Sequence, residues 1–562
     1  MRRSAALAIA ALLIVMVAAA PLSEADAGSS TETLYDGTEY GYTTYGSDYS
    51  TYRSTIDSVS SDAEGVWIST TLEGYNVTII GEGAADMPNA AWVVVPERVL
   101  TIESGAFSAC GSLTDVYFLG DMPEIADGAF PDGASFHVVS GTSGWDSYEG
   151  AVDCIEEATQ EASDGSSVRY LIIEGEAAAF EAEPSEDGSV TVESEASGYP
   201  VTSVAAYCMA GGDNEDGTNV EPRTDVVSVA IGDGVELIRE RAFYYSTGLE
   251  SVDIPDSVAA IMDEAFRAAG SLVSADIPGS VEYLGFECFR HCTSLPSISV
   301  PDSVTFMGEG AFKVCSSAES LVVGSGLEEI SAWAFCYCYD LTSVEFRGSP
   351  TVLGAEAFYN CTSLPSVELP DSVVSIGASS FYYCLSLESV GLGSSLESVG
   401  ASAFQECSSL SSVTFPETLD SIGRKAFAYC TSLTEAVFLG PMPDMDSTAF
   451  LSTGVTIHVA AAYADSWASY DGEFVVDGEE DGGDWLLAAV AALVVAVAAL
   501  AVCAAVVRRR SHRGRCTGLV RVPVNPVFMF RGWNSARCSI GGSSSRVFSE
   551  KVVKNLRFQS IL

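Results

Sequence analysis

Histidine and basic residues are scarce in this sequence. Its 562 residues include four histidines, and 26 Lys plus Arg face 77 Asp plus Glu, for a formal net charge of −51. The histidines are scattered through the chain as His137, His291, His458 and His512. None belongs to a cluster with metal-ligand spacing, so neither a catalytic zinc site nor a Ser-His-Asp site is expected. The acid excess disfavours nucleic acid as a partner. We therefore expect no enzyme, no cofactor and no metal.

Charge is absent from one long stretch near the C-terminus. Residues 485–507, "WLLAAVAALVVAVAALAVCAAVV", would form a helix about 34 Å long, which is enough to cross a bilayer. The basic run "RRRSHRGR" follows at once. The positive-inside rule then places a basic tail, residues 508–562, in the cytoplasm and the preceding residues outside. No L-P-x-T-G motif precedes the apolar run, so we expect a single-pass cell-membrane protein anchored by this helix.

Aliphatic residues are almost absent from residues 28–63, which predicts a flexible low-complexity leader. Before it, residues 1–27 combine Arg2 and Arg3, an apolar run and the small-residue sequence "ADA". This pattern predicts a secretory signal peptide, with an uncleaved anchor as the alternative. Two acidic stretches predict a linker over residues 151–166 and a stalk over residues 477–484.

Phenylalanine recurs every 23 residues across the second half of the chain. The positions are Phe243, Phe266, Phe289, Phe312, Phe335, Phe358, Phe381, Phe404, Phe427 and Phe450. Leucine or another apolar residue recurs at fixed offsets on either side of each of them. Columns of one fixed period are typical of a solenoid, in which stacked coils bury together what one coil cannot bury alone.

Each 23-residue unit reads as a short strand followed by a return segment. A Val-x-Ile stretch alternates with period 2, as a strand does, and a proline often ends it. We expect parallel strands joined by turns or short helices. Glycines four residues before the phenylalanine, such as Gly377 and Gly400, are expected to supply a turn with positive φ.

The unit resembles the BspA-like class of leucine-rich repeat. The sequences that carry the resemblance are "IPDSVAAIMDEAFRAAGSL", "VPDSVTFMGEGAFKVCSSA" and "LPDSVVSIGASSFYYCLSL". The resemblance implies a leucine-rich-repeat solenoid on a bacterial or archaeal cell surface. It also implies attachment to host matrix or to other cells.

A shorter copy of the pattern precedes the long one. "YFLGDMPEIADGAF" at residues 117–130 matches "VFLGPMPDMDSTAF" at residues 437–450. We therefore expect a first array with its cap over residues 64–150 and a main array over residues 167–476. An insert at residues 211–225 lacks the first acid and the final glutamate of a calcium loop, which favours a solvated loop.

Seven cysteines each lie three residues after a repeat phenylalanine. They are Cys292, Cys315, Cys338, Cys361, Cys384, Cys407 and Cys430. Equivalent residues of adjacent coils should have Cβ atoms about 4.8 Å apart, beyond the usual 3.5–4.5 Å of a disulfide. We expect reduced, buried thiols that serve a structural role rather than bind metal.

Two surfaces could hold a ligand. The solvent-facing positions of the Val-x-Ile strands form serine and acid columns, with candidate binding residues Ser251, Asp253, Asp276, Ser297, Ser299, Ser343, Glu345, Ser366 and Glu368. A second set of candidates, just after the repeat phenylalanines, is Tyr337, Tyr382, Tyr383 and Tyr429. Stacked repeats make such columns extended binding surfaces, and tyrosine favours interfaces. Alternatively, the first set is simply the solvated face of the sheet, and the tyrosines of the second set simply cover the edge of the hydrophobic core.

Together these features favour a membrane-anchored adhesion or binding protein that recognises a protein or glycan on another cell or on matrix. The alternative is a structural acidic envelope spacer without a dedicated ligand. Asn76 in "NVT" and Asn360 in "NCT" are candidate glycosylation sites if the host glycosylates exported proteins.

Overall fold

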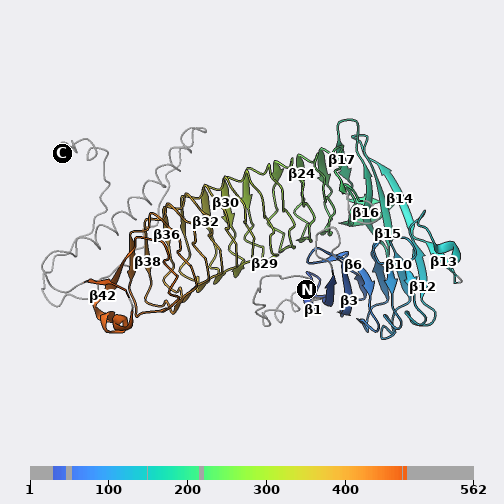
Figure 1. Ribbon diagram of the computed structural model, residues 1–562. Helices are drawn as coiled ribbons and strands as arrows, with labels where there is room; N and C mark the ends of the chain where they lie inside the picture. The colour runs from blue at the N-terminus through green and yellow to red at the C-terminus, as the bar shows by residue number, and fades with distance from the viewer. Residues whose placement is uncertain (1–28, 46–52, 149, 214–219, 471, 478–562) are drawn as a thin grey trace, which may run out of the picture. The chain divides into compact units, whose positions relative to one another are not determined.

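The computed structural model describes residues 29–45, 53–148, 150–213, 220–470 and 472–477. In these ranges the chain forms a leucine-rich-repeat solenoid of stacked β-coils, which confirms the predicted fold (Figure 1). The predicted signal peptide (1–27), transmembrane helix (485–507) and basic tail (508–562) lie outside the described residues, as does the stalk after residue 477. Over the described ranges, no helix has the length and apolar character needed to cross a bilayer.

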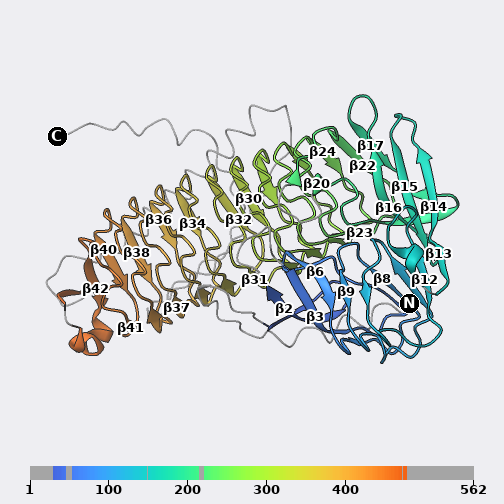
Figure 2. The same ribbon diagram turned by 45° about the vertical axis from the view of Figure 1, so that its right-hand side comes forward.

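The Val-x-Ile stretches of the main array form the predicted parallel strands (Figure 2). They are β17 Ser189–Val192, β22 Ser228–Ile231, β24 Ser251–Asp253, β26 Ser274–Ala275, β28 Ser297–Ser299, β30 Ser320–Val323, β32 Ser343–Phe346, β34 Ser366–Glu368, β36 Ser389–Gly391, β38 Ser412–Phe415, β40 Glu435–Phe438, β42 Thr456–Ala460 and β43 Phe474–Asp477. Serine lies opposite serine in successive pairs, for example Ser228 opposite Ser251 and Ser320 opposite Ser343. The fixed repeat length therefore sets the same register from coil to coil, although the strands divide into four hydrogen-bonded sheets.

Each coil also contributes a second, two-residue strand that ends at the apolar residue five before the phenylalanine. These strands are β23 Leu237–Ile238, β25 Ala260–Ile261, β27 Tyr283–Leu284, β29 Phe306–Met307, β31 Glu329–Ile330, β33 Val352–Leu353, β35 Ser375–Ile376, β37 Ser398–Val399, β39 Ser421–Ile422 and β41 Asp444–Met445. The longer strand β19 Tyr199–Val204 precedes them and pairs parallel with β23. The return segments between strands are turns. The only helices among the described residues are two 3₁₀ segments, η1 Trp145–Ser147 and η2 Ala461–Ser469, so of the two expected kinds of return segment the described repeats use the turn.

The first array repeats this arrangement on a smaller scale. Its Val-x-Ile-type strands are β4 Gly65–Trp67, β8 Trp92–Val95, β10 Asp115–Phe118, β12 Ser135–Val138 and β13 Val152–Cys154, and its second set is β6 Tyr75–Ile80, β9 Thr101–Ile102 and β11 Glu124–Ile125. Short strands β5 Thr71–Leu72 and β7 Ala85–Asp86 flank this array, and the main array has its own short strands β18 Glu195–Ala196, β20 Gly212–Asp213 and β21 Val220–Glu221. The last two lie in the insert, which is thus partly a hairpin.

The prediction of a flexible leader is wrong for the described residues before 64. β1 Ser29–Thr33, β2 Glu39–Tyr45 and β3 Arg53–Ser60 pair antiparallel in order, and β3 pairs parallel with β6. Tyr40 and Tyr42 alternate with more exposed residues and are 1% and 0% exposed. Aromatic rings thus supply the apolar area that the missing aliphatic residues do not, and the segment caps the first array.

The predicted acidic linker is likewise ordered. β13 pairs parallel with β12, and β14 Glu156–Glu161 pairs antiparallel with β15 Ser167–Ile173, which pairs with β16 Glu176–Glu183. Arg169 on β15 donates to Glu157 on β14 at 2.9 Å. A cross-strand pair of opposite charges stabilises β14 as a strand despite its acidic sequence. The chain therefore passes from one array to the other through paired strands rather than through a free linker.

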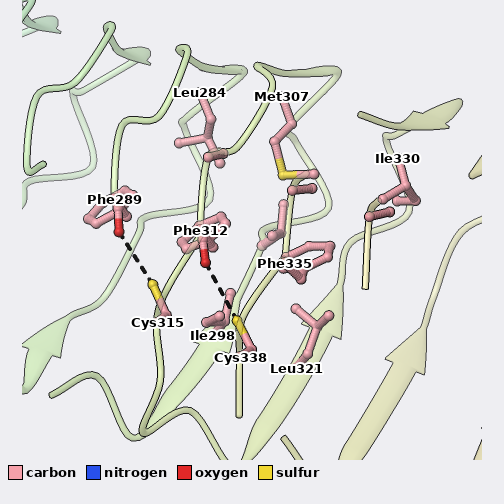
Figure 3. Packing of buried hydrophobic residues seen from close by; sticks show 14 of the residues in the cluster. Leu284, Phe289, Ile298, Met307, Phe312, Cys315, Leu321, Ile330, Phe335 and Cys338 are labelled. Atoms are coloured by element: carbon pink, nitrogen blue, oxygen red, sulfur yellow. Dashed lines mark hydrogen bonds between the residues drawn. The ribbon is translucent and has the colours of Figure 1, made fainter. Parts of the chain in front are cut away.

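The repeat phenylalanines form one continuous row, buried except for the partly exposed Phe450, and Figure 3 shows Phe289, Phe312 and Phe335 of this row. From Phe243 to Phe450, successive rings stack with centroids 4.7–6.0 Å apart. Leu284, Met307 and Ile330 line the same core in successive coils (Figure 3). A coil by itself would expose its ring, so the core exists only because the coils stack.

The glycines four before the phenylalanine have a different role from the predicted one. Gly377 and Gly400 do not adopt positive φ. A Cβ at either position would lie 2.6 Å from the backbone nitrogen of Ala355 or Ala378 in the preceding coil. Glycine is needed there because the backbones of adjacent coils approach closely.

The seven column cysteines are buried, free and hydrogen-bonded. Each thiol donates to the carbonyl of the phenylalanine in the preceding coil, as Cys315 does to Phe289 at 3.3 Å and Cys338 to Phe312 at 3.5 Å (Figure 3). Burial raises the pKa of Cys338 to about 12 and that of Cys384 to about 12. The thiolate form that reacts with electrophiles is therefore strongly disfavoured.

This burial gives a direct chemical test. Iodoacetamide added to the folded protein is expected to modify the exposed Cys154 and to leave the seven column cysteines unmodified until denaturant is added. Peptide mass spectrometry measures the labelling at each position. Labelling of Cys361 in the folded protein as fast as that of Cys154 would contradict the buried column.

The two arrays contact each other through a buried charged network. Arg241 of the main array donates from Nη2 to the carbonyl oxygen of Gly74 at 2.9 Å and from Nη1 to the amide oxygen of Asn76. Its Nε donates to the buried Glu264 at 2.5 Å, and Glu264 also pairs with Arg267. One guanidinium therefore joins strand β6 and its turn to the first coils of the main array.

Asp263 lies in the same interface, and Glu240, Glu264 and Glu73 act on it electrostatically. Burial, then the field of these carboxylates, raises the pKa of Asp263 well above its usual value. Its Oδ1 accepts from the backbone of Phe286 at 2.8 Å, whereas Oδ2 has no hydrogen-bond partner among the described residues. The ionised form is thus poorly accommodated.

The substitution Asp263→Asn is expected to stabilise the protein at about pH 8 and to have little effect at about pH 4. When folding raises the pKa of a carboxyl, the protonated group is tolerated in the folded protein at low pH. As the pH rises above the pKa of the unfolded chain, the group increasingly lowers the free energy of unfolding. Asparagine keeps the acceptor for Phe286 and carries no charge. Urea unfolding at both pH values measures the effect, and the exposed Asp253→Asn is the control. An equal effect of Asp263→Asn at both pH values would contradict this reading.

Candidate ligand-binding face

The predicted serine and acid columns lie on the outward side of the strands β24 to β36. Ser251, Ser297, Ser343 and Ser366 start their strands, each directly followed by a core residue such as Val252 or Ile298. The acids follow two residues later at Asp253, Asp276, Glu345 and Glu368, with Ser299 at the equivalent place on β28, and all five of these positions are exposed. We call this surface the acidic ladder.

Parallel pairing brings equivalent ladder positions side by side. Ser251 lies opposite Ser274, and Ser297 lies opposite Ser320. Glu368 lies opposite Gly391, where any Cβ would collide with the carboxylate of Glu368. The missing side chain at Gly391 leaves room for that carboxylate over β36, and partial desolvation there raises the pKa of Glu368 although the residue as a whole is exposed.

A hollow of about 420 Å³ opens on the ladder over β17, β22, β24 and β26. Its polar lining consists of Asp164, Ser189, Thr191, Ser228, Ser251, Asp253, Ser274 and Asp276. Three of the predicted residues, Ser251, Asp253 and Asp276, thus meet in one place. Their partners Asp164 and Thr191 were not predicted, because both precede the first regular 23-residue unit and no repeat pattern marks them.

Asp164 is fixed as an anion in this hollow. Partial desolvation raises its pKa, but hydrogen bonds from Ser166 and from Thr191, the latter at 2.7 Å, outweigh that effect and lower it. No group of three His, Cys, Asp or Glu side chains in the described part of the chain has the geometry to hold a metal ion. The hollow therefore offers carboxylates and hydroxyls to a ligand that carries hydrogen-bond donors or positive charge.

The predicted tyrosines follow the return segments. Tyr337, Tyr359 and Tyr382 form a row with centroids 5.3 and 5.2 Å apart, and Tyr383 contacts Tyr382 edge-on at 4.5 Å. Tyr429 lies two coils further along and is 36% exposed. Tyr337, Tyr383 and Tyr429 have φ near +62° and donate from their backbone N–H to the next coil. The structure joins three of the four candidates and shows that they also shape the turn.

The repeat matches a known protein family. A family model described as the BspA type leucine rich repeat region, in six copies, matches residues 68–144, 222–342 and 328–456. These ranges cover more than half of the 562 residues. The chain belongs to the BspA-type leucine-rich repeat family. The resemblance predicted from the sequence is thereby confirmed, and the matched ranges contain most of the acidic ladder.

Several solved structures are similar to this BspA-type chain. A leucine-rich repeat protein of T. pallidum is 25% identical, over 35% of this chain and 88% of its own, with a TM-score of 0.32. A leucine rich cell surface protein of Faecalibacterium prausnitzii is 22% identical, over 55% and 96%, with a TM-score of 0.30. A leucine-rich repeat protein of Bacteroides ovatus is 20% identical, over 59% and 100%, with a TM-score of 0.28. None of the curated proteins matches this chain.

The two candidate glycosylation asparagines lie in different surroundings. Asn76 is on β6 and its amide oxygen accepts from Arg241 in the interface between the arrays. Asn360 is partly exposed, has φ +60° and donates its backbone N–H to Tyr382 at 2.7 Å. A glycan on Asn76 would conflict with the Arg241 contact, whereas one on Asn360 would stand beside the tyrosine row.

Proposed function

We propose that this protein is a cell-surface binding protein whose acidic ladder holds a basic region of a protein partner. The observation that carries the proposal is the hollow over β17 to β26, where Asp164, Asp253 and Asp276 share one polar surface. Membership of a BspA-type repeat family supports a role in protein interaction. The net charge of −51 adds a long-range field that attracts a cationic partner.

The proposal includes attachment to the cell membrane. Residues 485–507 would span the bilayer once, with the arrays outside and residues 508–562 inside. The uncharged run and the basic residues after it support this topology. Anchoring would present the ladder to a partner on another cell or on matrix.

The test uses cells that display the full-length protein and adhere to immobilised matrix proteins or partner cells. Asp253→Asn with Asp276→Asn is expected to weaken adhesion about threefold to tenfold, mainly through slower association. Raising the salt from about 0.05 to 0.5 M should reduce wild-type adhesion strongly and that of the double variant less. The control pair is Glu236→Gln with Glu397→Gln, two exposed acids beside the second strand set.

Adhesion that the ladder variant and the control pair reduce equally would contradict a ladder-specific role. Absence of adhesion to any matrix or cell surface, together with weakened envelope integrity on deletion, would instead support an acidic spacer. Both results would overturn the proposal.

A further inference from the structure

A second hollow, of about 310 Å³, lies where the first array meets the main array. Strands β4 and β8 of the first array contribute Trp67 and Trp92, and the main-array strands β15, β16, β19 and β23 with their turns line the opposite side. A buried cluster that includes Val94 and Leu171 packs the two arrays together beside it. Figures 1 and 2 show this region, where the blue strands β8 and β10 meet the teal strands β15 and β16.

Arg239 stands out among the groups that line this hollow. Its guanidinium stacks over the ring of Trp67 at 3.9 Å, but it makes no salt bridge within the described residues. Its Nε is buried and has no hydrogen-bond partner there. Arg241, two residues later, binds Glu264, Asn76 and Gly74. An unpaired buried donor is costly, so the guanidinium of Arg239 is available to an acceptor that enters the hollow.

Two carboxylates at the rim of the hollow offer hydrogen-bond acceptors, whereas Arg239 offers donors. Glu174 accepts from the hydroxyl of Tyr117 at 2.7 Å through Oε1, and Glu176 accepts from Thr202 at 3.1 Å through Oε2. The second oxygen of each carboxylate receives no hydrogen bond from the described residues. Both side chains are therefore oriented by one neighbour and retain an acceptor for a ligand.

An aromatic ring completes the lining. A Cβ on Gly65 would lie 1.9 Å from the indole of Trp92, so this ring lies directly across Gly65. Its edge-on contact with Tyr117, at 6.4 Å between centroids, holds it in place. The ring of Trp92 thus offers a partly exposed apolar surface beside the polar groups.

We propose that this hollow binds an uncharged, hydroxyl-rich sugar ring, such as the terminal hexose or N-acetylhexosamine of a glycan. Hydroxyl groups both donate and accept, so they can satisfy Arg239 together with Glu174 and Glu176. The carbon face of a sugar can rest on Trp92. Three glutamates in the lining, Glu64 included, disfavour an anionic sugar. The ammonium of a cationic sugar carries no acceptor, so it cannot take the hydrogen bond that the unpaired Arg239 offers. The volume lies at the lower end of that of small-molecule sites, about 300–1,000 Å³.

The experiment titrates the full-length protein with methyl glycosides and follows binding by saturation-transfer NMR. The panel contains neutral hexosides, N-acetylhexosaminides, methyl uronides as anions and methyl hexosaminides as cations. At least one neutral glycoside is expected to saturate, and Arg239→Gln should weaken its binding about tenfold. The exposed pair Glu174→Gln with Glu176→Gln should weaken it several-fold without loss of fold. The control Arg347→Gln removes an exposed arginine of the acidic ladder and should have no effect.

Three outcomes would overturn the sugar site. They are no saturable binding of any neutral glycoside up to its solubility limit, binding that neither Arg239→Gln nor the glutamate pair weakens, and binding of uronides or hexosaminides alone. The site is independent of the acidic ladder, so Asp253→Asn with Asp276→Asn should leave glycoside binding unchanged. Failure of adhesion with intact glycoside binding, or the reverse, distinguishes the two proposals.

Discussion

Replacing Phe335 with alanine is expected to lower the free energy of unfolding by about 3–5 kcal/mol. The ring is fully buried and stacks on Phe312 and Phe358, with centroids 6.0 and 5.4 Å away. A coil contacts only its neighbours, so the cavity weakens two coil–coil interfaces at once. Unfolding should then separate into two transitions, one for the coils on each side of Phe335.

Chemical denaturation followed by circular dichroism, with hydrogen exchange to locate the opening, measures this effect. Phe306→Ala is the matched control, because Phe306 is 48% exposed although its ring stacks on Tyr283 at 4.7 Å. The control should cost less than about 1.5 kcal/mol. Similar losses from both substitutions would show that the phenylalanine row is not the continuous core described above.

Replacing Arg241 with methionine is expected to destabilise the contact between the arrays by about 3–5 kcal/mol. Among the described residues, the substitution leaves the fully buried Glu264 paired with Arg267 alone, and it removes the donors to Gly74 and Asn76. Burial raises the pKa of Glu264, but Arg241 and Arg267 outweigh this and lower it. Glu264 therefore stabilises the folded protein at pH values above the pKa of this carboxyl in the unfolded chain. This stabilisation is lost as the pH falls through the lower pKa that Glu264 has in the folded protein.

The double variant Arg241→Met with Glu264→Leu should cost less than Arg241→Met alone, because no uncompensated charge remains. Urea unfolding measures both, and limited proteolysis between residues 140 and 170 reports separation of the arrays. Arg347→Gln, which breaks an exposed pair with Glu345 at 3.3 Å, should be nearly neutral. A double variant less stable than the single would contradict the buried-network reading.

The fold of the main array could be predicted because a spacing of 23 residues recurs from Phe243 to Phe450. This spacing fixes which residues stack, so the column that contains Phe312 and Phe335 follows from counting alone. The second strand set was not predicted as strands, because two residues such as Ala260 and Ile261 are too few to show alternation. The role of Gly377 was misassigned for a related reason, since close approach between coils leaves no local sequence signal.

The caps show where repeat counting fails. Residues 29–45 and 53–60 contain few aliphatics, yet the buried rings of Tyr40 and Tyr42 help to pack these strands against the first array. The register of Ser251 and Asp253 followed from the repeat, whereas Asp164 reaches the same hollow from a hairpin outside it. Arg239 and Trp92 meet only because two arrays pack together, which the sequence of either array does not reveal.

The most direct test of stacked, interchangeable coils is the thermal unfolding of a protein that lacks one complete coil. Deleting residues 359–381 removes 23 residues and joins Phe358 to Tyr382, so every column stays in register. We expect a cooperative transition at a slightly lower midpoint, whereas deleting only residues 359–370 should abolish cooperative unfolding. Loss of cooperative unfolding in the 23-residue deletion, or equal behaviour of the two deletions, would contradict the solenoid on which this account rests.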